Sequence, residues 1–107
     1  VWYKDGQLYL GHDGPEYKTD IAFLKNEKLW CHCKNAEALA ELVKNDVHCF
    51  FHKTDDVTLT SNKYMWIFPR KKLLEGSICV LPEVAEYTEE ELQRCIGICS
   101  DVIGDYR

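Results

Sequence analysis

The 107-residue sequence lacks the features that would place it at once in several large classes of protein. It has no run of 18 or more apolar residues, so no transmembrane helix is expected. It also has no internal repeat, low-complexity segment or linker. A composition of 46% hydrophobic and 29% charged residues excludes collagen, coiled coils and wholesale disorder. Together these observations predict one globular domain spanning residues 1–107.

Signals of secretion are missing as well. The sequence starts at Val1 without a signal-like apolar segment, and no asparagine begins an Asn-x-Ser/Thr sequon. We therefore expect a cytoplasmic protein whose six cysteines are free thiols. An even number of cysteines permits up to three disulfides, and a disulfide framework is the alternative.

The sequence has no overall excess of basic residues, since it contains 13 basic and 18 acidic residues and has a net charge of −5. This balance excludes a protein that coats extended nucleic acid, since such binding releases counterions through many cations. The charge is uneven along the chain. Residues 75–107 are strongly acidic, whereas residues 63–72 contain four cations and no acid. A local basic patch of this kind suits a small anionic ligand.

Turn and cap signals predict an α+β fold with a mainly antiparallel sheet of six to eight short strands and two helices. Asp5-Gly6 is typical of a tight hairpin turn. The expected strands are Val1–Lys4, Gln7–Leu10, Ile21–Leu24, Lys28–Cys33, Val47–Lys53, Val57–Thr60, Tyr64–Phe68 and Ile78–Leu81. The third and fourth of these are expected to pair across a turn at Asn26-Glu27, and the sixth and seventh to form a second hairpin. Asn35 is expected to cap a helix over Ala36–Lys44. Thr88 and Glu91 form a capping box that starts a last helix, whose apolar periodicity extends to Ile103.

One strand carries alternating aromatic residues and is followed at once by cations. Tyr64, Trp66 and Phe68 share a face, so rings beside fixed charges could stack a base and neutralise its phosphates. The alternative is that these rings face the core. The predicted ligand-binding residues are Tyr64, Trp66, Arg70, Lys71 and Lys72.

A zinc site is an alternative for a second group of residues, which consists of Cys31, Cys33, His48 and His52. Residues two apart on a strand are roughly 6.6 Å apart, whereas thiolates on one zinc ion approach to roughly 3.8 Å. The strand would have to bend, and no Cys-x-x-Cys pair supplies the usual knuckle. We therefore expect these thiols, like Cys95 and Cys99 on the last helix, to pack as small core residues, and we expect no cofactor.

A third group suggests catalysis as a further alternative. His52 is followed closely by Asp55 and Asp56, and a histidine beside carboxylates could serve a small metal- or His/Asp-dependent hydrolase of the phosphodiesterase type. The simpler interpretation is a strand that ends in a solvated Asp-Asp turn.

Two segments are similar to the compact hairpin cores of small accessory proteins of bacteriophages: residues 52–69, and Gly97 to Asp101. The resemblance implies a small protein acting in the cytoplasm of an infected bacterium, where it blocks a host defence component or binds a signalling molecule. Our main hypothesis is a non-enzymatic binding protein whose partner is a small nucleotide-like anion or a host protein. A membrane partner is not expected, and pairing of strand edges makes a homodimer a candidate state.

Overall fold

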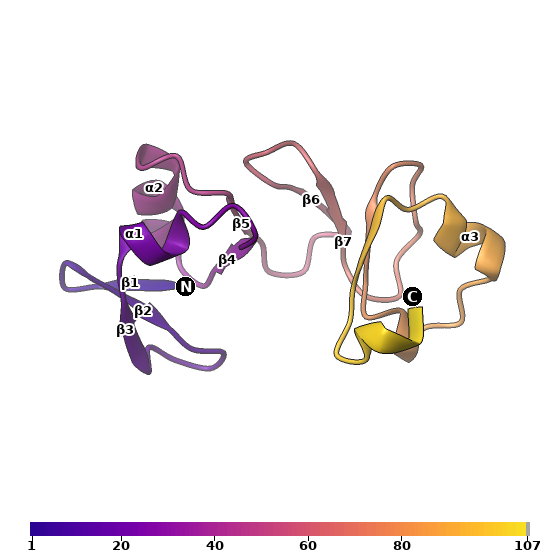
Figure 1. Ribbon diagram of the computed structural model, residues 1–107, viewed down its shortest axis with the longest axis horizontal. Coiled ribbons are helices and arrows are strands. Elements are labelled where there is room, and N and C mark those ends of the chain that lie inside the picture. The colour runs from indigo at the N-terminus through magenta and orange to yellow at the C-terminus, as the bar shows by residue number, and fades with distance from the viewer. Residues whose placement is uncertain (107) are drawn as a thin grey trace. The chain divides into compact units, whose positions relative to one another are not determined.

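The computed structural model describes residues 1–106 and confirms the α+β class (Figure 1). The chain divides into two compact units. Unit 1 comprises residues 1–53 and 60–62, and unit 2 comprises residues 54–59 and the chain from residue 63 onward. Each unit has its own core. Within the described residues, no helix has the length and apolar character needed to span a membrane.

Unit 1 opens with a small antiparallel sheet of three strands, β1 (Trp2–Lys4), β2 (Gln7–Leu10) and β3 (Tyr17–Thr19). The Asp5-Gly6 turn joins the first two strands, and the predicted hairpin is confirmed. Both turn residues have positive φ, 50° and 77°, as a type I′ turn requires. Strand β3 was not expected, because Tyr17–Thr19 is too short to show alternation, and its pairing with β2 defines it.

The segment Ile21–Leu24, expected as a strand, is instead the short helix α1. The reason is a local cap: the Asp20 side chain accepts a hydrogen bond from Phe23 N at 2.8 Å and satisfies a free donor of the first turn. The expected pairing of this segment with residues 28–33 is therefore wrong. Only the last part of that second segment, Cys31–Cys33, forms a strand.

A β-α-β arrangement forms the rest of unit 1. Strands β4 (Cys31–Cys33) and β5 (Cys49–Phe51) pair in parallel, and helix α2 (Ala36–Lys44) connects them. The predicted cap is confirmed, since Asn35 Oδ1 accepts from Ala38 N at 3.0 Å. The same side chain donates to Tyr3 O at 3.0 Å, which ties the start of α2 to β1.

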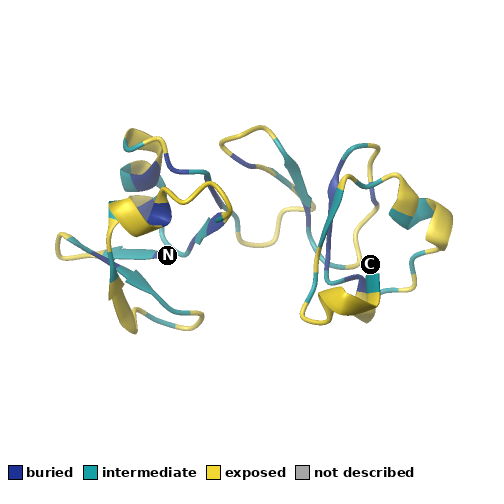
Figure 2. Ribbon diagram, in the orientation of Figure 1, coloured by how far each residue is buried: buried dark blue, intermediate teal, exposed yellow. Residues whose placement is uncertain are grey.

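The core of unit 1 lies under the inner face of α2 (Figure 2). Ala38 and Leu42, one turn apart, are both 0% exposed. The other buried members of the cluster are Val1, Leu8, Leu24, Cys31, Cys33, Val47 and Cys49. Three of the six thiols therefore pack as small apolar side chains in this core, as the sequence suggested.

Unit 2 is built on a four-stranded sheet in the order β6-β7-β8-β9. The predicted hairpin is confirmed: β6 (Val57–Leu59) and β7 (Met65–Ile67) are antiparallel. Strand β8 (Ile78–Val80) then pairs with β7 in parallel. Across both units of the described chain, parallel and antiparallel pairs are equally frequent, in place of the mainly antiparallel pairing expected.

The last helix is much shorter than expected. Helix α3 ends at Gln93 after beginning at Glu89, with the predicted Thr88–Glu91 capping box in place. Strand β9 (Gly97–Cys99) follows it and pairs in parallel with β8, and the 3₁₀ helix η2 covers Ile103–Tyr106. Gly97 is a weak helix former, and a Cβ at this position would lie 2.9 Å from Ile78 Cδ1, the end of a side chain that can shift. Pairing with β8 outweighs the helical periodicity.

The core of unit 2 is small. Ile67, Leu73 and Cys79 are buried, and a second set of half-buried residues packs against them. That set consists of Tyr87, Leu92, Cys95 and Ile98. The 3₁₀ helix η1 (Pro82–Val84) and helix α3 both lie on the connection between β8 and β9. Cys99, expected in the core, is exposed because it belongs to β9 rather than to a helix.

Candidate functional site

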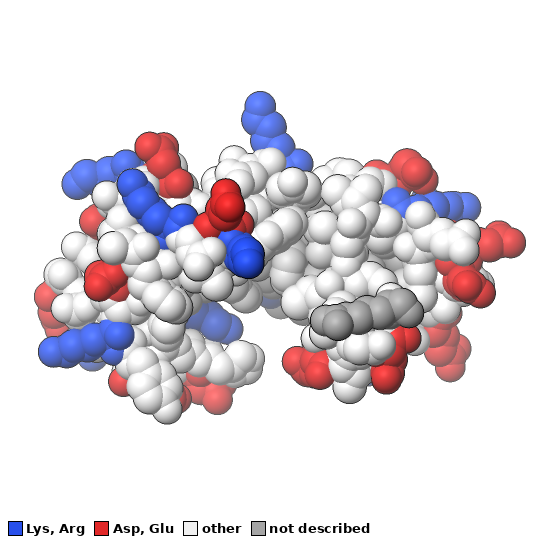
Figure 3. All heavy atoms as spheres, viewed as in Figure 1, with Lys and Arg blue, Asp and Glu red and all other residues white. Residues whose placement is uncertain are grey.

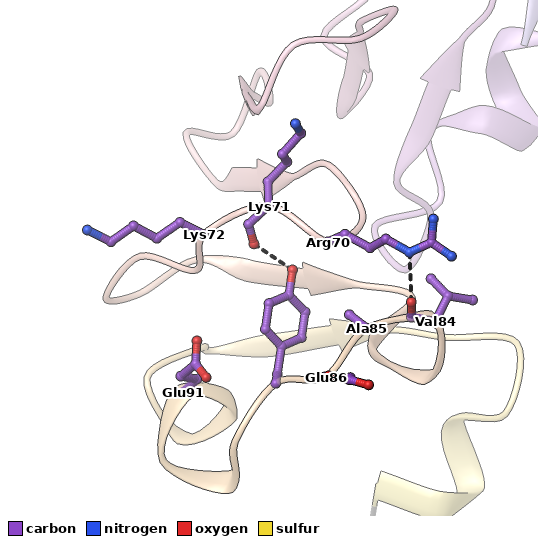
Figure 4. A pocket seen from close by; sticks show the side chains of 8 residues that line it. Arg70, Lys71, Lys72, Val84, Ala85, Glu86 and Glu91 are labelled. Carbon is purple, nitrogen blue, oxygen red and sulfur yellow. Dashed lines mark hydrogen bonds between the residues drawn. The ribbon is translucent and has the colours of Figure 1, made fainter.

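A surface pocket of about 560 Å³ lies in unit 2, next to the basic stretch (Figure 4). It is formed by the turn after β7, the end of η1, and the start of α3. The residues that line this pocket, called the Tyr87 pocket below, are Arg70, Lys71, Lys72, Val84, Ala85, Glu86, Tyr87 and Glu91. Its size is in the range typical of small-molecule sites.

The turn that carries the cations has a strained backbone. Lys71 N donates to Phe68 O at 3.1 Å, which closes a four-residue turn with Pro69 in the second position. Arg70 in the third position has φ of 70°. This is the geometry of a type II turn, where glycine is the preferred third residue. An L-residue with such a φ costs roughly 1–2 kcal/mol, and strain of this kind is concentrated at functional sites.

The Arg70 side chain is anchored at one atom. Its Nε donates to Val84 O at 2.8 Å, so the terminal guanidinium N–H groups stay available for an anion. The carbonyl comes from η1, which begins after a second residue with positive φ, Leu81 at 51°. Two unusual turns therefore fix the orientation of one guanidinium group at the edge of the pocket.

Tyr87 is the aromatic residue among those that line the pocket. Its hydroxyl donates to Lys71 O at 2.5 Å, and its ring packs against the core of unit 2. Burial raises the pKa of the Tyr87 phenol, so the group stays a neutral donor. Glu91 lines the same pocket, and its Oε1 accepts from Thr88 N at 3.0 Å. That hydrogen bond lowers the pKa of Glu91, which keeps the carboxylate ionised.

The three cations differ in their partners. The Lys71 amine lies 3.7 Å from the Asp56 carboxylate. Between residues 1 and 106, neither Arg70 nor Lys72 takes part in an ion pair. Their side chains extend from opposite ends of the pocket (Figure 4). Elsewhere, the face shown in Figure 3 carries basic and acidic side chains interspersed.

The structure thus brings three of the predicted ligand-binding residues to one pocket and leaves two outside its lining. Tyr64 and Trp66 are half-buried and make contacts of their own. The aromatic residue that lines the pocket is Tyr87, which the sequence reasoning missed. A local signal for it exists, because Tyr87 directly precedes the Thr88 cap and Leu92 lies four residues beyond that cap. This is the spacing of a hydrophobic staple, and both residues pack on the same core.

The residues of the zinc alternative lie on two faces of the β4–β5 pair. Cys31 and Cys33 point into the core, whereas the His52 ring stacks on His32 on the other face, with ring centroids 4.6 Å apart. His48 Nε2 lies 2.9 Å from Thr60 Oγ1. Over the described part of the chain, no three His, Cys, Asp or Glu residues gather in a way that could hold a metal ion.

The residues of the hydrolase alternative have other partners in the structure. His52 belongs to the ring stack of unit 1, where it also lies parallel to Phe50 at 5.8 Å. Asp56 belongs to unit 2 and faces the Lys71 amine. Asp55 is exposed. A general base must lie within hydrogen-bond reach of a substrate proton. The position of His52, stacked on the rings of His32 and Phe50, does not favour that role.

The ring stack makes one histidine sensitive to acid. Burial, and then the neighbouring charges of His52 and Lys34, lower the pKa of His32 to about 4 from 6.5. Between pH 6.5 and pH 4 the unfolded chain therefore binds a proton that the folded chain does not. As the pH is lowered from 6.5 to 4, we expect the free energy of unfolding to fall by on the order of 1–2 kcal/mol. This figure allows for solvent screening of a half-buried group.

His32→Phe tests this expectation, because it keeps a ring stacked on Phe50 and removes the titrating group. Urea unfolding at a series of pH values should show a flatter profile for the variant between pH 6.5 and pH 4. Parallel profiles for the two proteins would show that His32 is not the source of the acid sensitivity.

Comparison with known proteins gives no further guide to the site. No protein-family model matches the chain, and no curated protein or solved structure shows significant similarity to it.

Proposed function

We propose that the protein is a non-catalytic binding module that holds a small phosphate-bearing anion in the Tyr87 pocket. The observation that carries the proposal is that Arg70 and Lys72, two cations without ion pairs among residues 1–106, line the same pocket as the Tyr87 ring. In a chain with a net charge of −5, such cations attract an anion locally. Arg70 also has a positive φ of 70°, and backbone strain of this kind is enriched at functional sites.

The same pocket limits the charge of its ligand. Glu86 and Glu91 also line it, and the carboxylate of Glu91 is held ionised. A long polyphosphate would be repelled by these acids, whereas a nucleoside monophosphate carries one compact anionic group and a flat base. In the proposed mode, the base lies against the Tyr87 ring and the phosphate accepts from the terminal N–H groups of Arg70.

Replacing Arg70 with glycine separates binding from stability. We expect Arg70→Gly to raise the free energy of unfolding by at most about 0.5 kcal/mol, because glycine adopts the positive φ without strain while the exposed hydrogen bond from Arg70 Nε to Val84 O is lost. The same variant should weaken nucleoside monophosphate binding by about tenfold or more, since a charge-assisted hydrogen bond is lost. Isothermal titration calorimetry at low salt measures the affinity, and urea unfolding measures the stability.

Lys63→Gly is the matched control. Lys63 is also an exposed cation of unit 2 with positive φ, 68°, but it does not line the pocket. This control should gain similar stability and keep full affinity. Equal affinity in Arg70→Gly and Lys63→Gly, or no heat from the unaltered protein with any nucleoside monophosphate, would contradict the proposal.

The interpretation as a bacteriophage protein acting on a host component stays a prediction, as do the cytoplasmic location and the homodimer. The pocket suits a soluble signalling molecule as the bound component. The bacteriophage interpretation therefore predicts that the Tyr87 pocket binds the same class of ligand, a small phosphate-bearing anion.

A further inference from the structure

A second pocket lies in unit 1, far along the sequence from the Tyr87 pocket. Its volume is about 540 Å³. The end of β2, helix α1 and the segment before β4 form its apolar part. Leu24, 2% exposed, lies at the buried side, and Leu10 and Leu29 pack on the same core as Leu24. A pocket of this volume with apolar walls is the common form of a small-molecule site.

Two large aromatic side chains line this pocket while remaining accessible. Phe23 is 55% exposed and Trp30 is 36% exposed. The Trp30 ring lies 4.5 Å from the His48 ring, and the Asp20 cap holds the backbone of α1 at Phe23 N. A ring that already packs on a neighbour, as Trp30 does, loses little conformational entropy when a flat ligand covers it.

The polar side chains of the pocket are all basic. His12, His32 and Lys34 line it, and none of its described lining residues is acidic. His12 is exposed and pairs with Asp13 at 3.0 Å, outside the lining. His32 is neutral at neutral pH, because its pKa is about 4. Lys34 is therefore the lining residue that offers a charged side chain to a ligand. Among residues 1–106, its amine takes part in no ion pair.

From these observations we propose that the unit 1 pocket binds a small aromatic carboxylate. The aromatic ring lies against Phe23 and Trp30, and the carboxylate pairs with the Lys34 amine. Apolar walls, two accessible rings and a basic rim together select an amphipathic monoanion. The unit 2 pocket differs, because it mixes cations with carboxylates around a single ring.

Indole-3-acetate is a suitable probe, and tryptophol is its neutral analogue of nearly the same size. We expect saturable one-to-one binding of indole-3-acetate to the full chain, with amide NMR shifts centred on residues 23–34. Tryptophol should bind about tenfold more weakly, since it cannot pair with Lys34. Octanoate, a carboxylate without a ring, should also bind more weakly than indole-3-acetate.

Two variants with matched controls test the residues. Lys34→Gln and Phe23→Ala should each weaken indole-3-acetate binding by about fivefold to tenfold. Lys28→Gln and Tyr17→Ala alter exposed residues of the same unit outside the pocket, and they should bind as the unaltered protein does. Circular dichroism confirms that each variant is folded.

The inference is overturned by any of three results. These are the absence of saturable binding, equal affinity for indole-3-acetate and tryptophol or octanoate, and equal losses in the variants and their controls. The Arg70→Gly variant should bind indole-3-acetate normally, so this test is independent of the proposed function of unit 2.

Discussion

Replacing Leu42 with alanine is expected to lower the free energy of unfolding by about 3 kcal/mol. The Leu42 side chain is 0% exposed and lies on the inner face of α2, in the core of unit 1. Truncation removes apolar burial and leaves a cavity that close-packed neighbours fill only in part. A total stability of about 5–15 kcal/mol is typical, so the loss is a large share of it. Urea unfolding followed by circular dichroism measures the change.

Val43→Ala is the control for this substitution. Val43 is the next residue of the same helix but is 52% exposed, so its stability change should stay within about 0.5 kcal/mol. A similar loss in both variants would contradict the difference in packing between buried Leu42 and exposed Val43, because alanine is a better helix former than either residue.

The Leu42→Ala variant also tests whether residues 1–107 behave as one domain. Each unit has fewer than 60 residues, and chains of that size bury a marginal core. The chain also passes between the units three times. We therefore expect one cooperative transition, in which amide protection falls together in β4 and β8. Unchanged protection in β8 would instead establish two independent domains.

Replacing Ile67 with alanine should have an even larger effect, a loss of about 3–4 kcal/mol and a fall in the melting temperature of about 10–20 °C. Ile67 is 0% exposed, and it is one of only three buried residues in the described core cluster of unit 2. A small core has few neighbours that can close around a cavity. Thermal unfolding followed by circular dichroism gives the shift.

The control is Ile96→Ala, because Ile96 belongs to the same unit and is 63% exposed. Its melting temperature should change by no more than a few degrees. The Ile67→Ala variant should also weaken binding in the Tyr87 pocket near its melting temperature, since the Tyr87 ring packs on the same cluster. A melting temperature close to that of the Ile96→Ala control would show that the unit 2 core does not limit stability.

The elements that the sequence predicted well are those specified by neighbouring residues. The Asp5-Gly6 turn, the Asn35 cap and the Thr88–Glu91 capping box each satisfy backbone groups within a few residues. Such local hydrogen bonds form whatever the rest of the chain does. Their positions could therefore be read directly from residue types.

The elements that the sequence missed depend on distant partners. Strand β3 forms by pairing with the edge of β2, and β9 forms by pairing with β8. The parallel pairing of β4 with β5 likewise joins residues on either side of a helix. Periodicity within one segment contains no information on such partners, so an apolar stretch after Gln93 was read as more helix.

The candidate site shows the same division. The cations of residues 70–72 were evident from the sequence, because charge can be counted locally. Tyr87 was not, since only folding brings its hydroxyl to the carbonyl of Lys71, sixteen residues earlier. The rings of Tyr64 and Trp66 were preferred for their closeness in sequence, yet the pocket takes its aromatic residue from the segment before α3.

The discontinuity of unit 1 affects how the chain folds during synthesis. Residues 60–62 complete this unit: Ser61 N donates to Cys49 O at 2.8 Å, and Cys49 N donates to Ser61 Oγ at 2.9 Å. The first strand of unit 2, β6, therefore leaves the ribosome before unit 1 can close. A fragment ending at Lys53 would leave the backbone of β5 without these partners. The nascent chain thus cannot finish one unit before it begins the next.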